Sequence, residues 1–562
     1  MEVPLVPQTN RKKTPMYLIP LTIAITLVSI LVYYYPAFLR VHTPNNTVLI
    51  VNGQKIHSAI YVENNEILIP VDVIRDKFDP DFYYDRNTKI AIVTTKDKVL
   101  EMKTDKLTGY INSEEISFEA PIREINGKLF VPIEVLAPLY KLDIEYYDSA
   151  NSVVIRDKKR PVQKAVITSD YTFLRKHPTL RSPWILKLKA GEEVTVYKEE
   201  NNWLQVLTTK GKVGYIKESK SQLIAVAWEP YIRNEVNIPW SPLGGKINLT
   251  WDNVYSRPYS FSKAPFIKGA NVLSPTWFHL TSEGYIKNQA YKPYVEWAHE
   301  NNYQVWALFS NSFDPDLTHR VLSDPVKRKK VRNQLLVLAE LYQIDGINID
   351  FENMYYEDKD LFVQFIKEIT PFLHEMDLTV SVDVTVLSQS KRWSLVYDRK
   401  TLGDTVDYMI IMAYDQYPHS SKVAGPVSSI YWTERKLKEI LEIVPHDKLI
   451  LGVPFYTRLW REQKTEDGSI KVTSQALSMN SAEELLREHN VQPTLDTKTG
   501  LMYGEYKEGD SKYKIWLETA QSMRKRVDLI KKYDLAGLAS WRRGFEKPEI
   551  WDVIAEEIEK RP

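Results

Sequence analysis

Hydrophobic and polar residues alternate from Asp345 to Glu352, in the order Asp-Gly-Ile-Asn-Ile-Asp-Phe-Glu. Successive side chains of a β-strand point to opposite faces, so Asn348, Asp350 and Glu352 would share one face and the apolar residues the other. An acidic face is costly inside a protein, because unpaired buried carboxylates destabilise the fold. The pattern therefore predicts a catalytic strand, although acids that merely pair with Lys or Arg would alternate in the same way.

Two carboxyl groups in a row also favour acid–base chemistry. Asp350 and Glu352 would lie close enough to push their pKa values apart. One carboxyl group could then stay protonated at neutral pH as a general acid while the other stays charged.

Apolar strand patterns alternate with helical patterns over residues 244–562. Helices are expected, for example, over 331–341 and 361–376, and a helix is also expected to begin near Asp324-Pro325. Eight alternating units predict an α/β fold, a (β/α)8 or TIM barrel, with its active site at the carboxyl ends of the strands. The predicted strands are 247–254, 272–280, 304–310, 346–352, 378–385, 407–414, 449–456 and 537–541.

Several of these strand ends carry polar or aromatic residues, which packing alone does not explain. They are Trp277, Glu352, Tyr414, Asp415, Tyr456 and Trp541. Residues 457–518 exceed what one strand–helix unit needs and predict a small α+β insertion. Within it, alternating aromatics on both sides of Gly509-Asp510 predict a β-hairpin.

The amino-terminal part begins with an uncharged apolar segment, 16–39, which predicts a transmembrane anchor. Arg11-Lys12-Lys13 precede it, so residues 1–15 are expected to form a cytoplasmic tail. A single-pass protein of the cell membrane is predicted, with its catalytic part extracytoplasmic. A cleaved signal peptide is the alternative, and both place the chain after Arg40 outside the cytoplasm.

Two smaller modules are predicted between this segment and the barrel. Residues 46–158 contain a repeat in which Glu66–Ile74 returns 62 residues later as Lys128–Leu136. Each copy predicts a strand, a short helix that starts at proline, and two more strands. Residues 163–223 show the short, turn-separated apolar runs of a small all-β domain.

Composition narrows the function. Seventy-four basic and 73 acidic side chains among 562 residues argue against nucleic acid as a partner, because a basic surface is missing. Cysteine is absent, and no His-Glu pair has the second His of a zincin motif, so no metal site and no cofactor are expected.

Four motifs resemble glycoside hydrolase family 18, over nearly the whole carboxyl half. Asp345–Glu352 is similar to the signature Asp-Gly-x-Asp-x-Asp-x-Glu, with Asn348 in place of an Asp. The others are Met412-Ala413-Tyr414-Asp415, Gly452–Arg458 and Trp541. The variant Asn-Ile-Asp-Phe-Glu-Asn is most similar to the bacillar cell-wall and spore branch.

This resemblance implies substrate-assisted catalysis, and it implies a role for each matching residue. Glu352 would be the acid and base, Asp350 would stabilise the oxazolinium ion, and Tyr414 would hold the acetamido carbonyl. Asn348 would donate a hydrogen bond to Asp350. The remaining candidates would bind or shape the sugar site: Trp541, Asp415, Met412, Arg458, Trp277 and Tyr456.

The other two modules also resemble known families. Residues 46–158 are similar to the copper amine oxidase amino-terminal domain, although no copper ligands are present, and a spacer or wall contact is expected. Residues 163–223 resemble a bacterial SH3 domain, which could bind cell-wall peptide or act as a spacer.

The sequence thus predicts a membrane-anchored retaining glycosidase that cleaves β-1,4 bonds of a glycan containing N-acetylglucosamine. Peptidoglycan is favoured over chitin, because a tethered barrel would face the cell's own wall. A catalytically inactive wall-binding or scaffold protein is the alternative.

Overall fold

The computed structural model describes residues 18–40, 47–63, 66–160, 162–227, 245–254, 266–466 and 468–559. These residues belong to two compact units. The first comprises Met1–Phe82, Met102–Gly109 and Ile116–Asn234, and the second comprises Tyr83–Glu101, Tyr110–Glu115 and Glu235–Pro562.

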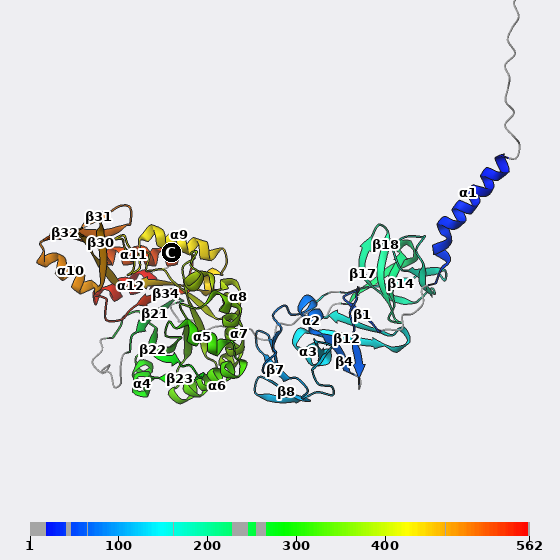
Figure 1. Ribbon diagram of the computed structural model, residues 1–562, viewed down its shortest axis with the longest axis horizontal. Helices are drawn as coiled ribbons and strands as arrows, with labels where there is room; N and C mark the ends of the chain where they lie inside the picture. Colours follow the sequence, from blue (N-terminus) through cyan, green and yellow to red (C-terminus); the bar gives the residue numbers. More distant parts are fainter. Residues whose placement is uncertain are drawn as a thin grey trace, which may run out of the picture. The chain divides into compact units, whose positions relative to one another are not determined.

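Eight parallel strands close into a barrel in the second unit (Figure 1). The strand order is β21-β34-β28-β27-β26-β25-β24-β22, and β21 pairs with β22 to close the ring. The predicted barrel is therefore confirmed. Its strands are β21 (Ile247–Asp252), β22 (Val272–Leu280), β24 (Gln304–Ser310), β25 (Gly346–Asp350), β26 (Thr379–Thr385), β27 (Tyr408–Met412), β28 (Leu449–Pro454) and β34 (Gly537–Trp541).

Helices surround this ring, as Figure 1 shows for α4 to α8. Helix α6 begins at Pro325, where the Asp324 side chain accepts from the first backbone amides, as the Asp-Pro pair predicts. A short strand, β23 (Ile286–Asn288), pairs antiparallel with β22. The helices are α4 (Lys292–Glu300), α5 (Pro315–Leu322), α6 (Pro325–Tyr342), α7 (Lys359–Glu375), α8 (Arg399–Thr405), α9 (Ile430–Leu441), α11 (Ala520–Lys532) and α12 (Glu549–Glu559).

The alternation in β25 gives the strand two faces. The apolar face packs in the core outside the ring of strands, and the other face carries Asn348 and Asp350. Ile347, Ile349 and Phe351 are fully buried in the outer core, where Phe351 stacks on Phe362 of α7 with ring centroids 5.7 Å apart. The strand ends at Asp350 rather than at Glu352, so the last two residues of the motif leave the sheet. Glu352 nevertheless remains on the same side of the chain as Asp350, because both line one cavity.

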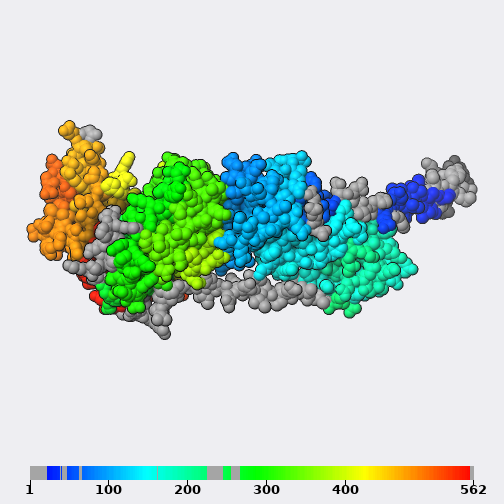
Figure 2. Space-filling model, turned by 90° about the horizontal axis from the view of Figure 1, so that it is seen from below, coloured from blue at the N-terminus to red at the C-terminus, as the bar shows by residue number. Residues whose placement is uncertain are grey.

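The expected insertion forms a five-stranded antiparallel sheet with one helix beside the barrel (orange in Figure 2). The predicted hairpin is β32 and β33, where Tyr506 stacks on Tyr513 at 4.8 Å. The elements are β29 (Tyr456–Lys464), β30 (Ile470–Ser478), α10 (Met479–Glu488), β31 (Thr494–Asp496), β32 (Leu501–Glu508) and β33 (Ser511–Leu517).

The first unit begins with helix α1 (Leu18–Tyr34), followed by a 3-10 turn that contains Pro36. In the described part of the chain, no helix is long and apolar enough to cross a membrane. The predicted anchor over 16–39 is therefore not confirmed. The expected cytoplasmic tail, 1–15, lies outside the described residues.

The repeat appears as two copies of the predicted element order. In each copy a proline precedes the helix, Pro70 before α2 and Pro132 before α3, and strands β4 and β11 pair antiparallel. The strands are β1 (Val48–Val51), β2 (Gln54–Ile56), β3 (Tyr61–Glu63), β4 (Glu66–Pro70), β5 (Tyr83–Asp85), β6 (Ile90–Thr94), β7 (Val99–Lys103), β8 (Thr108–Ile111), β9 (Glu114–Ser117), β10 (Arg123–Ile125), β11 (Lys128–Pro132), β12 (Leu142–Tyr147) and β13 (Ser152–Asp157). The helices are α2 (Val71–Lys77) and α3 (Ile133–Tyr140).

The next part of the first unit is all β. Seven strands form one sheet around a small apolar core, in the order β16-β15-β19-β18-β17-β14-β20. They are β14 (Val162–Ile167), β15 (Thr172–Arg175), β16 (Trp184–Leu188), β17 (Glu193–Glu200), β18 (Trp203–Thr208), β19 (Val213–Lys217) and β20 (Ser221–Ala227).

Candidate active site

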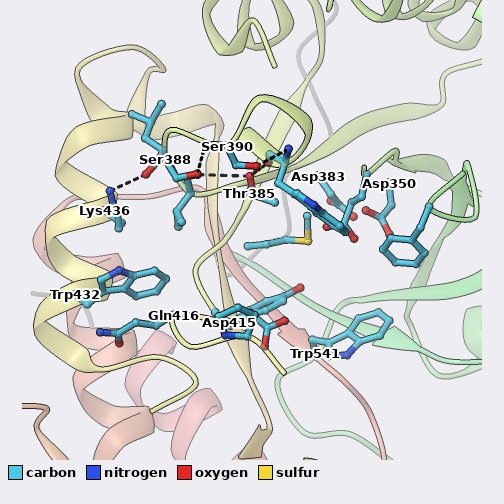
Figure 3. Close-up of a pocket in the computed structure, with 18 of the residues that line it drawn as sticks. Asp350, Asp383, Thr385, Ser388, Ser390, Asp415, Gln416, Trp432, Lys436 and Trp541 are labelled. Carbon is cyan, nitrogen blue, oxygen red and sulfur yellow. Dashed lines mark hydrogen bonds between the residues drawn. The ribbon is translucent and has the colours of Figure 1, made fainter. Parts of the chain in front are cut away.

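A cavity of about 820 Å³ opens at the carboxyl ends of the barrel strands (Figure 3). Six of the eight predicted strands supply residues that line this cavity. The lining residues near the acids are Trp251, Asp350, Glu352, Asp383, Met412, Tyr414, Asp415, Tyr456 and Trp541. The structure thus brings together seven of the ten candidate residues; Asn348 and Arg458 lie just behind the lining, and Trp277 lies elsewhere.

The two acids of the motif stand in an environment that resists ionisation. Burial raises the pKa of Asp350 to about 7. Burial also raises the pKa of Glu352 well above its ordinary value, and the negative charges of Asp350, Asp383 and Asp415 raise it further. Glu352 therefore keeps its proton more readily than an ordinary carboxyl group, as a general acid requires.

The main chain at Glu352 is held from both sides. Asn311, at the end of β24, accepts from the Glu352 N–H with Oδ1 at 3.1 Å and donates from Nδ2 to the Glu352 carbonyl at 2.7 Å. Tyr397 donates from its hydroxyl to the carbonyl of Phe351 at 2.8 Å. These bonds replace the sheet pairing that ends at Asp350, so the backbone that carries the proton donor is fixed.

Asn348 makes four side-chain hydrogen bonds and none to Asp350. Its Nδ2 donates to Asp383 Oδ1 at 2.7 Å and to Ser381 Oγ at 3.0 Å. Its Oδ1 accepts from Trp251 Nε1 at 2.8 Å and from Ser274 Oγ at 3.1 Å. The expected Asn348–Asp350 bond is therefore wrong, because both amide hydrogens are already committed to β26.

Tyr414 and Asp415 follow β27 into the cavity. Asp415 adopts a left-handed backbone (φ 53°) and its Oδ1 accepts from the Tyr456 hydroxyl at 2.7 Å and from Arg458 NH2 at 2.8 Å. Arg458 thus acts on the site through Asp415. The Tyr414 ring meets that of Tyr456 edge-on at 6.4 Å, and burial raises the pKa of Tyr414 well above its ordinary value, so its hydroxyl stays a donor.

Indole rings line the cavity at two places. Trp541, the last residue of β34, lies with its ring centroid 5.8 Å from that of Trp251 on β21. Trp393 and Trp432 also line the cavity, and Figure 3 shows Trp432 beside Lys436 and away from Asp350. Flat apolar faces of this kind suit the faces of pyranose rings.

Trp277 is the one candidate that the structure moves away from the site. It is fully buried in the outer core and meets Tyr294 of α4 edge-on at 5.3 Å. The pairing of β22 with β24 shifts register between Thr276 and Phe278, so the simple strand-end rule fails here.

Sequence reasoning missed Asp383, Trp251 and Asn311. A signal for Asp383 existed, because Ser381, Asp383 and Thr385 alternate with valines as the acids do in β25. Nothing in the residues around Trp251 or Asn311 distinguishes them from core. Among the described residues, no group of three or more His, Asp or Glu side chains is placed to hold a metal ion.

A closed parallel barrel with two neighbouring acids, tyrosines and tryptophans at its carboxyl end is an arrangement that suits glycoside hydrolysis. The chain belongs to the glycosyl hydrolases family 18, whose profile matches residues 248–546, more than half of the chain. Residues 50–155 match the copper amine oxidase N-terminal domain, and residues 170–222 match the bacterial SH3 domain. The three predicted resemblances are confirmed.

Several relatives of the barrel come from bacilli. The chain is 28% identical to the uncharacterized glycosylase YvbX of Bacillus subtilis (strain 168) over 294 residues, 50% of this chain and 83% of that one. It is 24% identical to the cortical fragment-lytic enzyme of the same organism over 255 residues, 45% of this chain and 58% of that one. The match thus spans little more than half of the second relative.

A solved structure shares the fold. The spore cortex-lytic enzyme SleL of Bacillus megaterium QM B1551 superposes with a TM-score of 0.50 at 23% identity, covering 61% of this chain and 77% of that one.

Proposed function

We propose that this family 18 enzyme is a retaining glycosidase that cleaves β-1,4 bonds of peptidoglycan after N-acetylglucosamine. The observation that carries the proposal is the placement of Asp350 and Glu352 in one cavity with Tyr414 and Trp541. Chitin oligomers are the second substrate class.

Glu352 is the proton donor in this proposal. Its raised pKa keeps the carboxyl group protonated, so it can give that proton to the glycosidic oxygen as the bond to the anomeric carbon breaks. The 2-acetamido oxygen of the substrate attacks the anomeric carbon from the opposite side and forms an oxazolinium ion. Glu352, now a carboxylate, takes a proton from the water that opens the ring, and two inversions retain the β-configuration.

The neighbouring groups stabilise that cation. Asp350 accepts a hydrogen bond from the acetamido N–H and offsets the positive charge. The Tyr414 hydroxyl donates to the acetamido oxygen, and Trp541 stacks under the sugar ring. Asp415, held by Tyr456 and Arg458, binds a hydroxyl group at the cavity wall.

The distant end of the cavity supports a substrate with a negative charge. Trp432 and Lys436 lie one turn apart on α9, and both line the cavity. Two of the three ammonium hydrogens of Lys436 are used, by the Leu387 carbonyl and by Glu439, each at 2.7 Å, which leaves one donor for a ligand. The lactyl carboxylate of N-acetylmuramic acid offers a negatively charged acceptor for this donor, whereas the acceptors of chitin are uncharged.

The relatives and the modules point the same way. The name of the cortical fragment-lytic enzyme describes an activity on spore cortex, and the SH3 module could bind wall peptide. We place the barrel outside the cytoplasm on these grounds, with residues 16–39 as its anchor.

Digestion of purified wall by residues 40–562 tests the bond and the substrate. Mass spectrometry should find muropeptides with N-acetylglucosamine at the reducing end, and Glu352→Gln should give none. Reducing-end N-acetylmuramic acid would overturn the bond assignment, and cleaved chitin beside intact wall would reverse the substrate order. Glycan binding with no turnover by either form would instead support a binding protein.

A further inference from the structure

Two carboxyl oxygens at the centre of the site are buried without a hydrogen-bond partner among the described residues. They are Asp350 Oδ1 and Asp383 Oδ2. Asp383 is 1% exposed, and its other oxygen accepts from Asn348. Leaving two such atoms unsatisfied would destabilise the fold, and more so if the groups are charged. A proton held by one carboxyl group and donated to the other would satisfy both.

The groups around Asp383 also favour a proton on this pair of carboxyl groups. The groups that interact electrostatically with it are Asp350, Glu352, Tyr397 and Tyr414, which are acids and phenols. Arg399 is adjacent to Tyr397, but its hydrogen bonds go to the Ser394 side chain and to backbone carbonyls. Burial and the Asp350 charge both raise the pKa of Asp383 well above its ordinary value. Two carboxyl groups that interact in this way resist ionising together.

Asn348 cannot supply a proton or a hydrogen bond to Asp350. It lies on the same strand as Asp350, but its amide donates to Ser381 and Asp383 and accepts from Trp251 and Ser274. All four of its hydrogen-bonding positions are therefore used, and an amide does not titrate. Figure 3 shows the carboxyl groups of Asp383 and Asp350 at the same end of the cavity.

We propose that Asp383, on the neighbouring strand β26, is the proton partner of Asp350: one proton is shared between Asp383 Oδ2 and Asp350 Oδ1. The inference rests on the proposed function. Asp383 acts on the substrate only through Asp350, so it is a positioning residue. It takes the place of a second acid on β25, where this chain has Asn348.

The shared proton can move as the reaction proceeds. As positive charge develops on the oxazolinium ion, the O–H bond on Asp350 breaks and an O–H bond forms on Asp383. Asp350 then faces the cation as a full carboxylate. The pair keeps a net charge of minus one throughout, and the proton returns when water opens the ring.

The test compares three variants with the wild type: Asp383→Asn, Asn348→Asp, and both together. The amide oxygen introduced by Asp383→Asn can still accept from Asn348, so a purely structural role predicts near-normal turnover. A proton-partner role predicts that Asp383→Asn lowers kcat about 100-fold with little change in KM. Adding Asn348→Asp to Asp383→Asn should recover at least about tenfold of that loss, because an acid again stands beside Asp350.

A spectroscopic readout separates this inference from the proposed function. Infrared spectra of protein labelled with carboxyl-¹³C aspartate should show a protonated aspartic acid at neutral pH that Asp383→Asn removes. Asp350→Asn offers a second route if Asp383→Asn does not fold. There the remaining Asp383 should titrate at lower pH, since its charged neighbour is gone. Wild-type turnover that Asp383→Asn leaves unchanged, or a band that survives Asp383→Asn, would overturn the inference. A wild type without turnover would reject the proposed function, and the infrared result would still decide the proton.

Discussion

Asn311 binds both backbone polar groups of Glu352 with one amide, accepting its N–H at 3.1 Å and donating to its carbonyl at 2.7 Å. The amide is itself fixed, because Nδ2 also donates to Thr318 Oγ1 at 2.8 Å. Glu352 thus lies just beyond the end of strand β25, yet both of its backbone polar groups are hydrogen-bonded, as they would be within a sheet.

Removing this amide should impair the reaction more than binding. Asn311→Ala frees the Glu352 backbone, and a displacement of about 1 Å can cost about 100-fold in rate. We expect kcat to fall by about 10- to 100-fold while KM changes little. Steady-state kinetics on a chitin oligomer measure both. Asn301→Ala, at the end of α4, is the matched control and should behave as wild type; a fall in affinity alone for Asn311→Ala would argue against the positioning role.

A charge added beside the acids should move the alkaline limb of the pH–rate profile. Glu352 must be protonated to act, and each negative neighbour raises its pKa. Asn348→Asp brings a further carboxyl group, so the limb should shift to higher pH, by about half a unit. The profile of kcat/KM in the two forms provides the measurement, and identical limbs would refute this electrostatic account.

The partly buried Trp541 and the fully buried Trp277 should separate sugar stacking from fold stability. Trp541→Ala removes the surface under the sugar and should lower kcat/KM by about 10- to 100-fold, as expected for about 1.4–2.7 kcal/mol of lost contact. Trp277→Ala opens a cavity between β22 and α4 and should lower the melting temperature, with kcat/KM nearly kept in the folded fraction. Thermal melts and kinetics of both variants give the comparison. Equal kinetic losses in two folded variants would contradict the placement of the sugar on Trp541.

Lys436 should distinguish peptidoglycan from chitin. Lys436→Met keeps the length of the side chain but removes the donor that would meet a lactyl carboxylate, so cleavage of wall glycan should fall about three- to tenfold, as for a loss of about 0.6–1.4 kcal/mol. Cleavage of chitin oligomers should not change. Lys438→Met, on the same helix but paired with Glu434, is the control. A parallel loss on both substrates would remove this support for an anionic ligand.

The acids of β25 were predictable because the alternation of a strand depends only on neighbours in sequence. The same rule identified the strand ends that bring Tyr414, Tyr456 and Trp541 together. It failed at Trp277, because the pairing of β22 with β24 shifts register there and no local sequence pattern predicts the shift.

The residues that support the acids were harder to find. Asn311 and Asp383 lie 41 residues before Glu352 and 35 residues after Asn348, so only the closed ring of strands brings them into contact. The hydrogen bond expected from Asn348 to Asp350 failed for the same reason, since its preferred partner comes from another strand. Apolar length alone also did not reveal that the helix within residues 16–39 ends at Tyr34, before a turn that contains Pro36.

The central claim is that the substrate's acetamido group attacks while Glu352 donates the proton. The most direct measurement compares two β-1,4 glycans that differ only in the N-acetyl group at the sugar bound next to Glu352, each with wild type and Glu352→Gln. The account predicts cleavage of the acetylated glycan by wild type, release of the β-anomer in proton NMR, and no cleavage of the deacetylated glycan or by the variant. Equal cleavage of both glycans, or an unchanged rate in Glu352→Gln, would contradict it.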